Sequence, residues 1–157
     1  MSGVWLSSLL SATLALLLIW GAATDLRNRI ISNKLNIVIA LLAPLWWWAK
    51  GLSLYPDVAI QLGLALLLFA LFAGLFALGM MGGGDVKMLG ALALWLPLPE
   101  MANLIIIMAL LGGLVTIVTV IHHRVTRRIG QPEIPYGVAI ALAGLWVMGK
   151  PYLNPLA

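Results

Sequence analysis

The chain has 157 residues, of which 63% are hydrophobic and only 9% are charged, and its mean hydropathy is +1.09. Such a composition excludes a water-soluble domain of this size. With no cysteine, the chain cannot form a disulfide framework, a thiolate nucleophile or a Cys-ligated zinc site, and its net charge of +4 must be interpreted from where the charges lie.

Apolar runs recur along the whole chain, so we expect a single integral membrane domain over residues 1–157. The first run has no preceding Lys or Arg and is longer than a signal-peptide core, so it should remain as a membrane helix. Six segments are predicted to be helical: residues 3–24, 35–49, 58–80, 86–99, 101–121 and 136–150. The predicted fold class is an all-α membrane protein, a bundle of six transmembrane helices.

The polar links between these segments predict the topology. Seven of the nine cations lie in the links after the first, third and fifth segments: Arg27, Arg29, Lys34, Lys87, Arg124, Arg127 and Arg128. The positive-inside rule makes this side cytoplasmic, so both termini should face outward. Six of the seven tryptophans fall at the opposite ends of the segments, which agrees with this orientation because Trp favours membrane interfaces.

The fourth segment looks too short to cross a bilayer, as do the second and sixth. A helix needs about 20 residues to cross ~30 Å of hydrocarbon, and the fourth supplies only about 12 to 14. Its inner end at Asp85 should therefore lie in a recess below the cytoplasmic surface. Non-helical backbone at such a depth needs protein or water around it, and Gly82, Gly83 and Gly84 suit a breach of this kind.

Two of the five acidic residues are unusual in position. Asp57, Glu100 and Glu133 fall in polar links, where a solvated charge needs no explanation. Asp25 and Asp85 instead lie at the cytoplasmic ends of membrane segments, where a folded bundle can bring them together. Two carboxylates in one partly desolvated recess share a proton and can act as acid and base, as in the aspartic proteases.

Structural roles remain as alternatives for these residues. Asp25 can be an interfacial stop charge beside two arginines. Asp85 can cap a helix that begins at Val86, a role compatible with catalysis. Lys87 either marks the membrane interface or steadies a carboxylate charge.

Other hydrolytic chemistries lack the residues they need. His122 and His123 are adjacent in a polar link, and no serine has the context of a nucleophile elbow. No HExxH pattern occurs, so we expect neither a metal site nor a cofactor.

Three motifs resemble those of one family. GGGD at residues 82–85, followed by VKMLGAL, resembles the GxGD signature of intramembrane aspartic proteases, and in detail the type IV prepilin peptidases. TDLRNRIISNKLN from Thr24 is similar to the first aspartate motif of that family, although Ser32 replaces a frequent proline. EIPYGVAIALAG from Glu133 is similar to the entry of its final helix. The motifs occur in matching order and spacing, and together they cover most of the chain.

This resemblance implies that Asp25 and Asp85 are the catalytic aspartates, that Gly82 and Gly84 are the motif glycines, and that Lys87 helps to shape the site. It implies a peptidase in the bacterial inner membrane, with its active site facing the cytoplasm, that cuts the leader of a prepilin or pilin-like protein before its hydrophobic segment. The lipid bilayer and pilus-assembly machinery are the further partners that we expect, and no nucleic acid is expected.

Long members of that family carry an extra cytoplasmic domain with paired cysteines and also methylate the new N-terminus. This chain has no cysteine and no room for such a domain, so no methyl transfer is expected. Its compact size resembles the short peptidases of Tad/Flp pilus systems, with the archaeal preflagellin peptidases as the nearest relatives to exclude. The alternative from another class is a non-enzymatic membrane protein, either an ion pathway through two buried carboxylates or a pilus-assembly scaffold.

Overall fold

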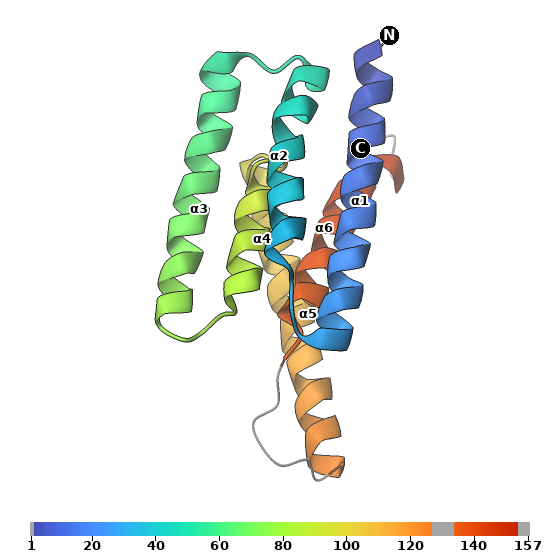
Figure 1. The fold of residues 1–157 in the computed structure, drawn as a ribbon, viewed down its shortest axis with the longest axis vertical. Helices are drawn as coiled ribbons and strands as arrows, with labels where there is room; N and C mark the ends of the chain where they lie inside the picture. Colours follow the sequence, from blue (N-terminus) through green and yellow to red (C-terminus); the bar gives the residue numbers. More distant parts are fainter. Residues whose placement is uncertain (1, 127–133, 154–157) are drawn as a thin grey trace.

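The structure is a computed structural model that describes residues 2–126 and 134–153, and these residues form helices and connecting turns without strands (Figure 1). The main helices are α1 Ser2–Asn28, α2 Asn33–Lys50, α3 Ala59–Ala77, α4 Gly83–Ala93, α5 Leu98–Val125 and α6 Tyr136–Leu153. A single helical turn, η1 Leu54–Val58, precedes α3. The predicted all-α class and the six predicted helical segments are thereby confirmed. Arg127, Arg128 and Glu133 lie outside the described residues.

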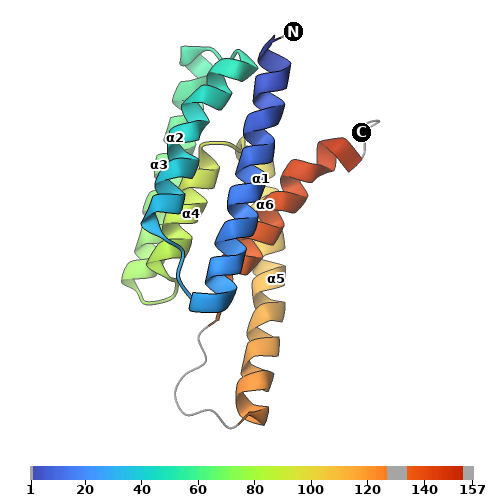
Figure 2. The same cartoon turned by 45° about the vertical axis from the view of Figure 1, so that its right-hand side comes forward.

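Three helical stretches among the described residues are long and apolar enough to cross a membrane: Gly3–Asn28, Leu54–Ala77 and Leu98–Val125. The helical stretch Tyr136–Lys150 is apolar but shorter. Because apolar helices recur along the chain, the protein is a multi-pass membrane protein. The beginning of α1 and the end of α6 lie toward one end of the bundle, and the turns after α1 and α3 lie toward the other (Figures 1 and 2).

The short helix α4 lies at the centre of the bundle. It has 11 residues and is about 16 Å long at ~1.5 Å per residue, as the short fourth segment predicted. It packs against α2, α3 and α6, while α1 packs against α2 and α6, and α5 packs against α6. Met88, Leu89 and Leu92 of α4 are fully buried. The helix α4 is therefore held by three neighbouring helices.

The C-terminal end of α4 is held by side chains from α2 and α3. The last carbonyl groups of a helix lack partners within the helix and are costly to leave unpaired away from water. Gln61 Nε2 donates hydrogen bonds to the carbonyl oxygens of Ala93 at 2.6 Å and Leu96 at 2.7 Å. Trp47 Nε1 donates to the carbonyl oxygen of Leu94 at 2.8 Å. These bonds allow a short helix to end inside the bundle.

Candidate active site

Asp25 and Asp85 line the same pocket, at the end of the bundle where α1 and α3 turn back. The pocket has a volume of about 670 Å³. We call it the aspartate pocket, and its walls include Asp25, Arg29, Ile31, Gly82, Asp85 and Tyr136. The pocket is therefore formed by the end of α1, the loop after it, the glycine turn before α4 and the beginning of α6. The two carboxylates that the sequence singled out come together, although they lie on helices that do not follow one another in the chain.

Asp25 is held by the first turn of α6. Its side chain is only 5% exposed, and its Oδ2 accepts a hydrogen bond from the backbone N–H of Val138 at 3.2 Å. The first N–H groups of a helix have no partner within the helix, and the helix dipole favours negative charge there. The beginning of α6 thus both satisfies its own backbone and stabilises a carboxylate on α1.

Gly137 makes this contact sterically feasible. A Cβ atom at this position would lie 2.5 Å from Ile31 Cδ1 and 2.8 Å from Asp25 Oδ2. Carbon atoms in favourable contact are about 3.5–4.0 Å apart, so the backbone of α6 can approach Asp25 this closely only without a side chain. Gly137 belongs to the third motif, but no specific role is predicted for it from the sequence, because a glycine in a membrane helix more often serves general helix packing.

Asp85 lies inside α4 rather than before it. The alternative role of Asp85, as the cap of a helix that begins at Val86, does not apply, because α4 begins at Gly83 and Gly82 is the capping residue, in an extended conformation. The physical reason is that a carboxylate in the first turn is itself favourable at a helix N-terminus. The non-helical segment before α4 is therefore shorter than predicted: it ends at Gly82, and Gly83 and Gly84 are helical.

The two motif glycines permit close packing around Asp85. A Cβ atom on Gly82 would lie 2.9 Å from Asp85 Oδ2, and one on Gly84 would lie 3.1 Å from Ile31 Cβ. The Asp85 side chain can therefore fold back over Gly82, while Gly84 packs against the loop that follows α1. Earlier in the same turn, Gly79 adopts a left-handed conformation with φ 73°, which ends α3.

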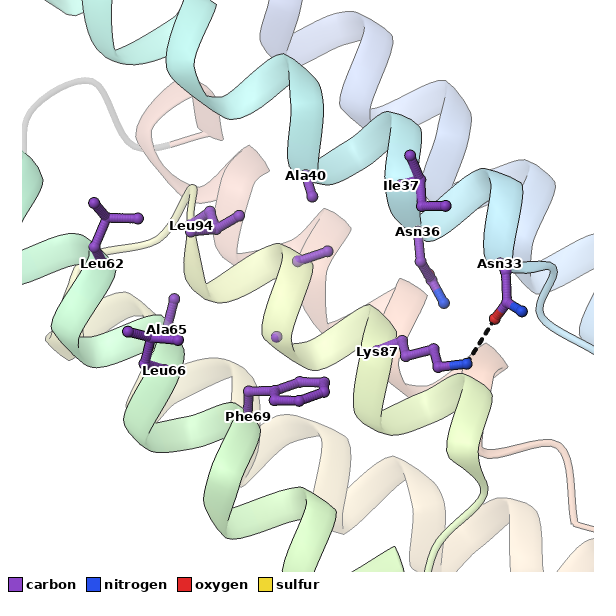
Figure 3. A pocket seen from close by; sticks show the side chains of 12 residues that line it. Asn33, Asn36, Ile37, Ala40, Leu62, Ala65, Leu66, Phe69, Lys87 and Leu94 are labelled. Atoms are coloured by element: carbon purple, nitrogen blue, oxygen red, sulfur yellow. Dashed lines mark hydrogen bonds between the residues drawn. The ribbon is translucent and has the colours of Figure 1, made fainter.

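Lys87 lies at a second pocket instead of the aspartate pocket (Figure 3). Its Nζ donates a hydrogen bond to Asn33 Oδ1 at 2.8 Å, so it links the beginnings of α4 and α2. Next to it, Asn36 Nδ2 donates to the carbonyl oxygen of Gly84 at 3.2 Å. No role is predicted for Asn36 from the sequence, although a polar amide in an apolar segment can indicate a functional position.

The loop between α1 and α2 accommodates the replacement of the motif proline. Ser32 has φ −69° and ψ 143°, a conformation that proline also adopts, and it is the capping residue of α2. Its Oγ accepts a hydrogen bond from the N–H of Leu35 at 3.2 Å. The serine thus keeps the backbone that a proline would impose and adds a side-chain cap.

A family model described as the type IV leader peptidase family matches residues 12–117 of the chain. The chain belongs to the type IV leader peptidase family. The match contains Asp25, the glycine turn and Asp85, and it confirms the family predicted from the three motifs. Comparisons with curated proteins and with solved structures found no significant match. Within residues 2–126 and 134–153, this leader peptidase family member has no group of three or more His, Asp or Glu side chains that could hold a metal ion.

Proposed function

We propose that the chain is a membrane-embedded aspartic endopeptidase that removes the leader of prepilins or pilin-like proteins at the cytoplasmic face of the bacterial inner membrane. The observation that carries this proposal is that Asp25 and Asp85 line one pocket in a member of a leader peptidase family. Gly82 and Gly84 act as the motif glycines that allow this arrangement, and Lys87 supports the site from the opposite side of α4.

In the proposed reaction, one carboxylate takes a proton from a water molecule while the other, protonated, donates its proton to the scissile carbonyl oxygen. The water oxygen forms a bond to the carbonyl carbon. When the resulting diol collapses, the C–N bond breaks, the first carboxyl group gives its proton to the departing nitrogen, and one hydroxyl of the diol returns a proton to the second carboxylate. We assign the base to Asp25, because the N–H of Val138 and the N-terminus of α6 favour its ionised form. Asp85 is then the acid.

The proposed topology has six transmembrane helices in one domain over residues 1–157, with both termini outside the cytoplasm. It is supported by the positions of Arg27, Arg29, Lys34 and Lys87, which lie in or next to the turns at the end of the bundle that holds the aspartate pocket. In this topology, Asp85 lies in the first turn of the short helix α4 at the cytoplasmic end of the bundle, and a cytoplasmic leader can reach it there.

We further propose that the protein cleaves without methylating its product, and that it serves a Tad/Flp-type pilus rather than an archaeal flagellum. The absence of cysteine from these 157 residues supports this narrower assignment. No cofactor has a role in the proposed reaction, and the working partners are the substrate, the bilayer and the pilus-assembly machinery.

The test is cleavage of a co-reconstituted Flp-type prepilin by wild type, Asp25→Asn and Asp85→Asn, with sequencing of the product N-terminus. Glu100→Gln is the control, because Glu100 lies in the first turn of α5, outside the aspartate pocket. We expect each Asn variant to lose about 10²–10⁴-fold or more in rate while remaining folded. A folded Asn variant that cleaves at the wild-type rate would refute the two-aspartate mechanism, and absence of cleavage by wild type would refute the proposed substrate.

A further inference from the structure

The second pocket is a groove between α2 and α3 with α4 as its floor (Figure 3). We call it the α2–α3 groove, and its volume is about 520 Å³. Its apolar walls are formed by Ile37, Ala40, Leu62, Leu66, Phe69 and Leu94. Both α2 and α3 pack against α4 but make almost no contact with each other, so the groove is open along its length. Four of these side chains are exposed, Leu66 by 69%.

The groove has a polar end beside the glycine turn. Asn33, Asn36 and Lys87 line this end, and Asn36 bonds through its Nδ2 to the carbonyl oxygen of Gly84. Asn36 is only 5% exposed, yet its Oδ1 has no hydrogen-bond partner within the described part of the chain. A buried acceptor without a donor costs free energy, above all inside a membrane protein. The site therefore fits a ligand that brings an N–H group to Asn36.

This polar end adjoins the aspartate pocket. Ile31 and Gly84 line the aspartate pocket, while Asn33 and Lys87, two and three residues further along the same two segments, line the groove. A polypeptide that leaves the groove at Asn36 has only the beginnings of α2 and α4 to pass before it reaches Asp25 and Asp85. An extended peptide also offers the backbone N–H that Asn36 lacks.

We propose that the α2–α3 groove binds the apolar helix of the protein substrate and that Asn36 receives a backbone N–H where the helix gives way to the extended cleavage segment. This inference rests on the proposed function and deepens it, because it names the surface that selects the substrate. Helices associate in membranes by close van der Waals packing, and a groove between two splayed helices offers one helix face a matching surface. A phospholipid is the competing occupant.

The test uses two adjacent leucines of α3 that are almost equally exposed, Leu66 at 69% and Leu67 at 67%, of which only Leu66 lines the groove. A photoreactive phenylalanine analogue is placed at position 66 or 67 of the full-length Asp85→Asn variant, in vesicles that contain the Flp-type prepilin. We expect a crosslink from position 66 to the apolar segment of the prepilin and none from position 67. Equal crosslinking from both positions, or crosslinks to lipid alone, would overturn the inference.

The second measurement is of cleavage kinetics, for Leu66→Trp and Leu67→Trp in an otherwise wild-type chain. Leu66→Trp should raise KM for the prepilin by about tenfold with little change in kcat, because it obstructs binding more than chemistry, while Leu67→Trp should change neither. An unchanged KM in Leu66→Trp would count against the groove. Wild-type cleavage is measured in the same vesicles, so failure of the groove proposal, with cleavage intact, is distinguished from failure of the proposed function, with no cleavage at all.

Discussion

Replacing Gly137 by alanine tests whether the position of Asp25 depends on the close approach of α6. The new Cβ would lie 2.5 Å from Ile31 Cδ1, 2.8 Å from Asp25 Oδ2 and 3.0 Å from Asp25 Cγ. The Ile31 methyl group can rotate aside, but the Asp25 carboxylate must move by roughly 0.5–1 Å to reach ordinary contact distance. A misplacement of about 1 Å at a reacting group can cost 10²-fold in rate. We therefore expect kcat to fall about 100-fold, or ~2.7 kcal/mol.

The free energy of unfolding should fall by about 0–2 kcal/mol in this variant, which is less than the expected rise of the activation free energy. Overpacking costs about 1–3 kcal/mol, and alanine recovers up to about 1 kcal/mol of helix propensity. The assay compares initial rates of leader removal and thermal unfolding for wild type, Gly137→Ala and Gly149→Ala. Gly149 is the matched control, because it lies on the same helix and a Cβ there would meet nothing within 4 Å. A cleavage rate of Gly137→Ala within about twofold of wild type would show that close packing by α6 does not position Asp25.

Three further predictions concern the supports of the site. Gln61→Leu should lower the free energy of unfolding by about 1–3 kcal/mol, because two carbonyl oxygens at the end of α4 lose their donor, and an unchanged unfolding midpoint would contradict this. Val138→Pro removes the N–H that Asp25 accepts, while Val138→Ala keeps it. Because that bond favours the charged carboxylate, only Val138→Pro should move the acidic limb of the pH–rate profile to higher pH, and an unmoved limb would argue against Asp25 as the base. Ser32→Ala should lower the free energy of unfolding by about 1 kcal/mol, because α2 loses its side-chain cap. An unchanged thermal unfolding midpoint would contradict a stabilising role for this cap.

The number and order of the helices could be predicted because membrane segments are set by hydropathy and length, both of which are local properties of the sequence. Their ends could not be predicted equally well, because they depend on contacts. Ser32 caps α2, which therefore begins at Asn33 rather than at residue 35. The predicted fourth segment ran to residue 99, but α4 ends at Ala93 because Gln61 and Trp47 bind the carbonyl groups that follow.

The pair of aspartates could be identified from sequence because a carboxylate at the end of an apolar segment is rare. The contacts that hold the two aspartates in place could not be identified in the same way. The bond from Val138 to Asp25 joins the first helix to the last, and no periodicity within either segment encodes it. Lys87 is predicted from the motif to help shape the site, but it lines the α2–α3 groove instead of the aspartate pocket. Residues two apart at a helix start point in different directions.

The two ends of α4 differ in how firmly neighbouring side chains hold them. Gln61 and Trp47 bind its C-terminal end, near which the rings of Trp46 and Trp95 lie 5.6 Å apart, whereas its N-terminal end begins in a run of glycines. Displacement of the glycine turn by a bound substrate would therefore move Asp85, while the bonds from Gln61 and Trp47 keep the C-terminal end of α4 in place. In the proposed topology, water for hydrolysis can then enter at the glycine-rich end of α4 without opening a path across the bilayer, so that peptide cleavage and the permeability barrier would depend on opposite ends of one short helix.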